Sequence, residues 1–119
     1  MSHKPLPNYL RAFRKSCGLS QDELAFLLEC QSGKTVSRYE RFGREPDLSK
    51  ALACEVIFAA AARELFAGLY FEVEKATVKN VQFLLEKLTV ARRDRATQRK
   101  IRMLEAVLEK KLDVLKTAA

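Results

Sequence analysis

Apolar residues in the first 45 positions recur at intervals of three or four, which is the period of an amphipathic helix rather than of a strand. The first such segment, residues 8–17, is predicted to be a helix that ends at Gly18, a residue suited to a left-handed C-terminal cap. Its predicted buried stripe consists of Tyr9, Leu10, Phe13 and Cys17. Strand-like alternation is absent from the chain, so we expect an all-α fold.

Two short helices separated by a polar turn are predicted next. Ser20 followed by Glu23 is a capping box, in which each side chain hydrogen-bonds to the backbone N–H of the other residue. Ser32 can cap the following helix, predicted over residues 33–41. The predicted buried side chains are Leu24, Ala25, Leu27 and Leu28 in the earlier helix and Val36 and Tyr39 in the later one.

A fourth helix is predicted after Asp47, which can cap it. Its expected inward side chains are Leu48, Ala51, Leu52, Val56 and Ile57. The four alanines at 59–62 either continue this helix or form a short turn. A fifth short helix is then expected to carry Leu65, Phe66 and Leu69.

The pattern changes from Phe71 onward, where two longer apolar stripes occur. Their members are Val78, Val81, Leu85 and Leu88, and then Ile101, Leu104, Leu108, Leu112 and Leu115. The basic segment ARRDRATQRK lies between them, so we predict two amphipathic helices joined by a basic connection. We therefore expect a first domain at residues 1–70 and a C-terminal helical extension at residues 71–119.

Charge favours an anionic partner, nucleic acid first, because the formal net charge is +7 and the isoelectric point is near 9.5. A basic surface that only keeps the protein in solution is the alternative. Residues 1–70 hold 10 basic and 8 acidic side chains, whereas residues 71–119 hold 12 and 7. The charge excess is therefore concentrated in the C-terminal extension.

The basic cluster of the extension has two interpretations. It comprises Arg92, Arg93, Arg95, Arg99, Lys100 and Arg102, with only Asp94 opposing. It is either a second phosphate-binding patch or a solvated connection between helices, and the sequence favours the latter. The apolar stripes beside it need a partner, because neither helix can remain in solution alone. The partner is either the other helix of the extension, residues 48–70, or the same helices of a second subunit.

The remaining chemistry of the sequence excludes several classes of protein. Cys17, Cys30 and Cys54 form no C-x-x-C pair and His3 is the only histidine, so we predict no metal site and no cofactor. We expect all three cysteines to be small buried side chains in a reducing compartment, with a thiol redox switch as the alternative. No signal-peptide core follows the start, and the apolar stretch at 51–71 contains three charges, so we expect a cytoplasmic protein without membrane spans.

Several short motifs in the first half occur in a specific order and spacing. They are R-x-x-x-G-L-S-Q at Arg14 to Gln21, E-L-A at Glu23 to Ala25, V-S-R-Y-E at Val36 to Glu40 and R-x-P at Arg44 to Pro46. On these motifs, residues 6–70 resemble the Cro/C1-type (XRE) family of helix-turn-helix regulators of bacteria. The resemblance implies a five-helix lambda-repressor-like DNA-binding domain, to which this chain adds a C-terminal helical hairpin extension.

The resemblance also implies roles for individual residues. Arg14 is expected to pair with Glu40 for structural reasons, and Gln21 to contact the DNA backbone. The base-reading positions on the third helix fall on Lys34, Thr35, Ser37 and Arg38. Arg38 is the first choice, since arginine bonded to guanine is the commonest specific contact. Arg41 and Arg44 are expected to meet phosphates.

The sequence departs from the family pattern at two loops. The turn after Leu28 has one extra residue and no glycine directly after that leucine, which puts the start of the third helix, and with it Lys34, in question. The loop after the fourth helix is alanine-rich where the family often has G-V-P.

These expectations combine into a sequence-specific regulator that binds double-stranded DNA. We expect a repressor acting as a homodimer on an inverted-repeat operator, with the extension as the dimer element. The alternative is a protein–protein adaptor that keeps the helix-turn-helix fold. An enzyme is not expected, because no nucleophile–base grouping and no glycine-rich phosphate loop are present. A small-molecule effector is neither indicated nor excluded.

Overall fold

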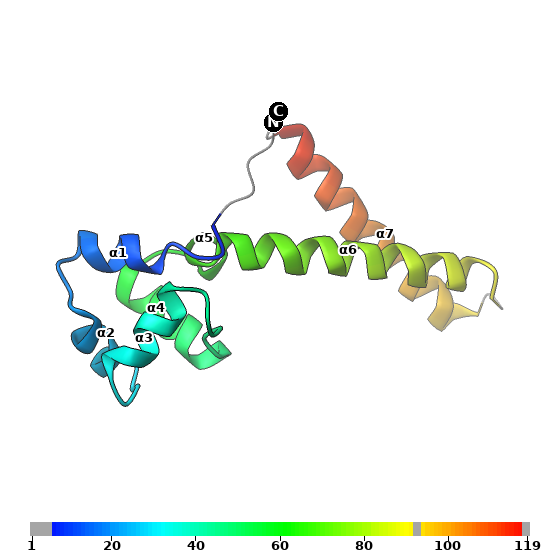
Figure 1. The fold of residues 1–119 in the computed structure, drawn as a ribbon. Helices are drawn as coiled ribbons and strands as arrows, with labels where there is room; N and C mark the ends of the chain where they lie inside the picture. Colours follow the sequence, from blue (N-terminus) through cyan, green and yellow to red (C-terminus); the bar gives the residue numbers. More distant parts are fainter. Residues whose placement is uncertain (1–5, 92–93, 118–119) are drawn as a thin grey trace. The chain divides into compact units, whose positions relative to one another are not determined.

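A computed structural model describes the backbone of residues 6–91 and 94–117 and the side chains of residues 6–91 and 94–111. His3, Arg92 and Arg93 lie outside these ranges, as do the side chains of Leu112 and Leu115. The described residues form helices and loops without any strand, which confirms the all-α prediction (Figure 1). In chain order the helices are α1 (Leu10–Ser16), α2 (Gln21–Leu27), α3 (Gly33–Glu40), α4 (Leu48–Phe58), α5 (Ala62–Leu65), α6 (Ala67–Thr89) and α7 (Arg95–Thr117).

The chain divides into two compact units, Met1–Phe71 and Glu72–Ala119. The first unit contains α1 to α5 and the beginning of α6. The second contains the rest of α6 and all of α7. Helix α6 is continuous across the division.

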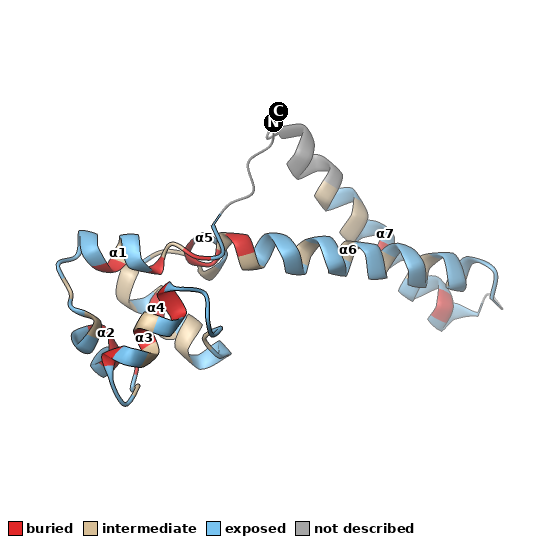
Figure 2. Cartoon of the chain, in the orientation of Figure 1, coloured by how far each residue is buried: buried red, intermediate tan, exposed pale blue. Residues whose placement is uncertain are grey.

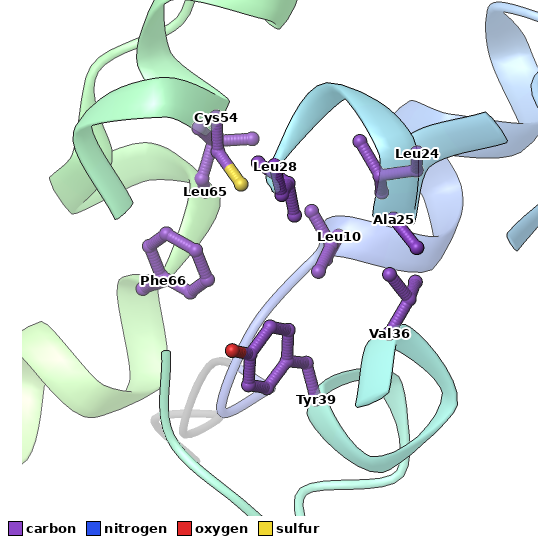
Figure 3. Close-up of a cluster of buried hydrophobic side chains, with 9 residues drawn as sticks. All are labelled: Leu10, Leu24, Ala25, Leu28, Val36, Tyr39, Cys54, Leu65 and Phe66. Atoms are coloured by element: carbon purple, nitrogen blue, oxygen red, sulfur yellow. The ribbon is translucent and has the colours of Figure 1, made fainter. Parts of the chain in front are cut away.

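The core of the first unit is a cluster of buried side chains contributed by all of its helices up to α5 (Figure 3). Its members are Leu10, Leu24, Ala25, Leu28, Val36, Tyr39, Cys54, Leu65 and Phe66. Phe13 and Phe58 pack against the cluster, and their ring centroids lie 5.8 Å apart. Burying a leucine or a phenylalanine contributes roughly 1.5–3 kcal/mol each. This cluster therefore holds the short helices together, none of which would be stable alone.

Side-chain caps explain where the helices begin. Ser20 Oγ accepts a hydrogen bond from the Glu23 amide at 3.0 Å, and Glu23 Oε1 accepts one from the Ser20 amide at 2.8 Å. The hydrogen bond from the Ser20 backbone lowers the pKa of the Glu23 carboxyl. Ser32 Oγ likewise accepts from the Lys34 amide, and Asp47 Oδ1 from the Lys50 amide. These contacts place the starts of α2, α3 and α4 where the sequence predicts them.

The faces predicted for α2 and α4 are partly wrong. Leu27 is exposed, and so are Leu48, Leu52 and Val56, with 75% and 83% of Leu48 and Val56 accessible. Helix α4 is buried instead at Cys54, with Ala51 and Ile57 half-buried beside it. Because α4 is apolar around nearly its whole circumference, the spacing of its apolar residues did not distinguish the inner from the outer face.

The cysteines differ in environment. Cys54 is fully buried, and desolvation raises its pKa to about 11. Cys30 is half-buried, whereas Cys17 is exposed, contrary to the prediction, because α1 already ends at Ser16 and Cys17 is its C-terminal cap. All three are free thiols.

Helix boundaries near the division of the chain differ from the predicted ones. The alanine segment contains a turn: α4 ends at Phe58, Ala59 has a left-handed φ of 51°, and α5 covers only four residues. Helix α6 begins at Ala67 rather than near residue 71. Gly68 in its first turn donates its N–H to the Leu6 carbonyl at 2.8 Å, and a Cβ at this position would collide with the backbone of residues 6 and 7. The glycine therefore lets the chain before α1 lie directly against α6.

The second unit buries few side chains. The stripe residues of α6 are half-buried, and in α7 Leu104 is buried while Ile101 and Leu108 are half-buried. Glu74 and Lys111 form an ion pair between the two helices. Among the described side chains of residues 72–111, only Thr97 and Leu104 are buried (Figure 2). The predicted basic connection is mostly helical, because α7 starts at Arg95.

Replacing Ala59 with glycine is expected to stabilise the first unit. A left-handed conformation costs an L-residue with a Cβ roughly 1–2 kcal/mol, and glycine avoids most of that cost. We expect Ala59→Gly to raise the free energy of unfolding by about 1 kcal/mol, measured by urea denaturation. Ala12→Gly, at an exposed right-handed position inside α1, should lower it by about the same amount. A loss of stability in Ala59→Gly would contradict this account of the turn.

Candidate nucleic-acid interface

The first turn of α2 and the first turn of α3 lie in direct contact. The Gly33 amide donates to Asp22 Oδ1 at 2.9 Å, and a Cβ on Gly33 would come within 2.5 Å of the same oxygen. Ala25 and Val36 are buried farther along the two helices. Glycine at the start of α3 and alanine in the middle of α2 thus allow the close approach that fixes the angle between the helices.

The turn between α2 and α3 has no glycine directly after Leu28, and another residue takes the left-handed conformation there. Glu29, directly after Leu28, takes a left-handed φ of 60° although it carries a side chain. The Cys30 amide then returns to the Ala25 carbonyl at 2.8 Å and closes the end of α2. The extra residue is accommodated before Ser32, so α3 starts at Gly33 and Lys34 lies in its first turn.

A buried ion pair connects α1 with the end of α3. Arg14 Nε and Nη2 donate to the two carboxylate oxygens of Glu40 at 2.6 and 3.1 Å, and Arg14 Nη1 donates to the Leu19 carbonyl at 2.8 Å. The two side chains are only 9% and 3% exposed. The hydrogen bond with Glu40 raises the pKa of Arg14, so the guanidinium stays charged.

Gln21 extends this pair to the start of α2. Its Nε2 donates to Glu40 Oε1 at 3.1 Å, so one carboxylate holds an arginine from α1 and an amide from α2. Gln21 itself is only half-buried. Its side chain is therefore anchored on its inner side and open to the surface on its outer side.

A shallow concave surface covers the starts of α2 and α3. It is lined by Arg14, Ser20, Gln21, Asp22, Ser32, Gly33, Lys34, Ser37, Arg38 and Arg41. Lys34, Arg38 and Arg41 are exposed and come from successive turns of α3 and its C-terminal cap. The arrangement presents cations, a hydroxyl and an amide on one small helical surface, as groove and phosphate recognition requires.

Comparison with known protein families agrees with this geometry. A family model described as helix-turn-helix matches residues 10–64. Residues 10–64 are a Cro/C1-type helix-turn-helix domain. Domains of this family belong to DNA-binding regulators, and their fold is the lambda-repressor-like one. No curated protein and no solved structure is significantly similar to the chain.

The helix-turn-helix domain brings five of the seven residues expected to contact DNA onto the concave surface. They are Gln21, Lys34, Ser37, Arg38 and Arg41. Thr35 is half-buried beside it, and its amide donates to the Ser32 carbonyl. Arg44 lies in the loop before α4. The pKa of Asp47 is lowered mainly by its hydrogen bond from the Lys50 amide, and to a smaller extent by the charge of Arg44.

Sequence reasoning did not assign Asp22, Ser32 and Gly33 to this surface. Asp22 and Gly33 reach it through their mutual hydrogen bond, which joins residues eleven positions apart and has no local sequence signal. Ser32 was expected only as a helix cap, and its hydroxyl does accept from the Lys34 amide. These three residues form the part of the concave surface that surrounds the start of α3.

Other kinds of site are not apparent in the residues that the structure describes. No group of three or more potential metal-ligating side chains comes together among them. None of the described helices combines the length and the apolar character needed to cross a membrane.

The pair of Arg14 and Glu40 should behave as one unit in the helix-turn-helix domain. Arg14→Met leaves a buried carboxylate without its counter-charge, and Glu40→Leu leaves a buried guanidinium, so each should lower the free energy of unfolding by about 3–5 kcal/mol. The double variant should lose far less than the sum. Urea denaturation of all four proteins measures the coupling.

Lys15→Met provides the control, because Lys15 is an exposed neighbour on α1 and its loss should change stability by less than about 0.5 kcal/mol. Additive losses in the double variant would show that the ion pair does not tie α1 to α3.

Proposed function

We propose that this protein is a sequence-specific regulator of transcription that docks α3 in the major groove of double-stranded DNA. One observation carries the proposal: the exposed face of α3 presents Lys34, Ser37 and Arg38 next to Gln21 at the start of α2. Within the described residues, neither Lys34 nor Arg38 makes an ion pair. Their charges are therefore available to an external anion. By occupying its site in a promoter, the protein acts as a repressor.

Each side chain has a role that follows from its position. Arg38 reads a guanine through its planar pair of donors, while Lys34, Thr35 and Ser37 contact neighbouring base edges. Gln21, Arg41 and Arg44 contact phosphates and set the register of α3 in the groove. The buried pair of Arg14 and Glu40 contributes indirectly, because it holds α1, α2 and α3 in one arrangement.

Arg38→Ala should lower specific affinity and relax the base preference at one position of the site. The expected loss is about 1–3 kcal/mol, or roughly 5- to 150-fold in affinity. The measurement is selection of duplexes with a randomised core, sequencing of the bound pool and titration of the enriched duplex. Arg63→Ala is the matched control, because Arg63 is exposed on α5 and outside the concave surface.

An unchanged base preference in Arg38→Ala would remove α3 from base reading. If wild-type protein enriches no sequence and its binding disappears as salt rises, only backbone attraction remains. The adaptor alternative would then be favoured over a regulator with its own operator.

The second unit supports assembly as a dimer. A unit of this size that buries only Thr97 and Leu104 among its described side chains falls short of an independent core. The positions one before the inward residues hold exposed Val73, Leu84 and Met103 and half-buried Val107, together with Thr77, Asn80, Lys87, Ala96 and Lys100. Helix α7 turns back after a short connection and crosses α6 (Figure 1), and on each helix these residues lie on the same side of the inner stripe. The opposite flank is polar throughout and consists of Lys75, Lys79, Gln82, Glu86, Thr89, Gln98, Arg102, Glu105 and Glu109.

The apolar side chains of the first flank, called the apolar flank below, fit a second copy of the same helix pair, which would form a four-helix bundle. A symmetric dimer presents two copies of α3 and requires an inverted repeat with half-sites about one helical turn apart. The selection experiment above tests the repeat, since a lone enriched half-site would argue against the dimer.

Charges placed on the apolar flank should separate the two copies. Leu84→Glu combined with Met103→Glu is expected to shift the mass measured by sedimentation equilibrium from a dimer to a monomer, because carboxylates would be buried in the bundle. Gln82→Glu with Gln98→Glu adds the same charge to the polar flank and should leave the dimer intact. Equal masses for wild type and the flank variant would refute this dimer surface.

A further inference from the structure

Helix α7 carries three arginines on the face opposite its apolar stripe. Arg95, Arg99 and Arg102 follow one another at steps of four and three residues and are exposed. The inner stripe of the same helix runs through Thr97, Ile101 and Leu104, and at 100° per residue it lies on the other side of the helix. The packing of α7 on α6 therefore leaves the guanidinium groups directed away from the helix pair.

The stability of α7 does not account for these arginines. Arg95 and Arg99 are like charges four residues apart, a spacing that destabilises a helix. They also stand in the first turns, at the positive end of the helix dipole, where cations are unfavourable and where α7 has no acidic residue. Asp94, which precedes Arg95 in the sequence, caps the helix by accepting from the Thr97 amide at 2.8 Å.

None of the three guanidinium groups forms an ion pair with another described residue. Among the described residues, the ion pairs are those of Arg14 with Glu40 and of Lys111 with Glu74, and no contact neutralises Arg95, Arg99 or Arg102. An external anion would relieve the repulsion between the like charges and the mismatch with the dipole at once. The placement of this cluster is thus explained by a ligand rather than by folding.

The geometry of the stripe suits a phosphodiester backbone. The Cα positions of Arg95 and Arg102 are separated by about 10.5 Å at 1.5 Å rise per residue. This is comparable to the axial rise across four successive phosphates of one DNA strand, at about 3.4 Å per step. The planar guanidinium fork matches phosphate oxygens. The stripe contains no aromatic residue on which an unpaired base could stack. A duplex contacted only through phosphates fits these side chains best.

We propose that Arg95, Arg99 and Arg102 form a second, sequence-independent DNA-binding surface, which contacts the phosphate backbone of duplex DNA. This inference rests on the proposed function and extends it from the helix-turn-helix domain to the C-terminal helix pair. It also explains why the charge excess of the chain is concentrated after residue 70.

The test uses the full chain and a triple variant, Arg95→Gln with Arg99→Gln and Arg102→Gln. Fluorescence anisotropy measures binding to a random-sequence 30-bp DNA duplex over a series of KCl concentrations. Each phosphate contact contributes about 0.9 to the slope of log K against log salt, so the triple variant should reduce the slope by about 2 to 3. The matched control, Lys75→Gln with Lys79→Gln and Lys110→Gln, removes the same charge elsewhere on the helix pair and should change the slope by less than about 1.

Three outcomes would overturn the inference: an unchanged slope in the triple variant, an equal change in the control, or stronger competition by duplex RNA or anionic vesicles than by unlabelled DNA. Circular dichroism confirms that the variants keep their helix content. Failure of the proposed function is seen separately, because the triple variant should retain the base preference in the selection experiment, whereas Arg38→Ala should not. A wild-type protein without base preference whose slope still depends on the stripe would retain this inference and refute the operator.

Discussion

The arrangement of the first unit depends on one buried carboxylate. Glu40 stands at the end of α3 and receives hydrogen bonds from Arg14 on α1 and from Gln21 on α2, while Arg14 also binds the Leu19 carbonyl between those helices. A charge in such surroundings is tolerated only with a full set of partners. These buried hydrogen bonds fix the direction of α3 relative to α1 and α2. They thereby also fix the direction in which the exposed face of α3 points.

Sequence predicted the elements whose signals are local. The caps at Ser20, Ser32 and Asp47 act within three residues, and the starts of three helices follow from them. The buried faces of helices were predicted correctly where polar residues mark the outer face, as on α3. They were mistaken on α4, where Leu48 and Val56 are as apolar as the buried Cys54, so that only tertiary packing selects the inner side. The apolar residues of α4 therefore did not indicate which of its faces is buried.

In the candidate site too, the features with local sequence signals were predictable, and those that depend on tertiary packing were not. The positions of Lys34, Ser37 and Arg38 on α3 follow from helical spacing once the start of the helix is known. The contact of Asp22 with Gly33, the left-handed Glu29 and the hydrogen bond from Gln21 to Glu40 depend on how α2 and α3 meet. Likewise, the basic segment expected to connect two helices is itself largely helical, because α7 starts at Arg95. Its arginines at positions 95, 99 and 102 therefore fall on one face of a helix.

The hydrogen bond between Gln21 and Glu40 has a consequence for the thermodynamics of docking. A primary amide has two N–H donors, and one of them on Gln21 is held by the carboxylate. The other remains for an anion, so Gln21 stands as a neutral spacer between a buried negative charge and a phosphate that would otherwise repel each other. Its rotamer is also already fixed, so the conformational entropy of this side chain is lost when the chain folds and not when DNA arrives.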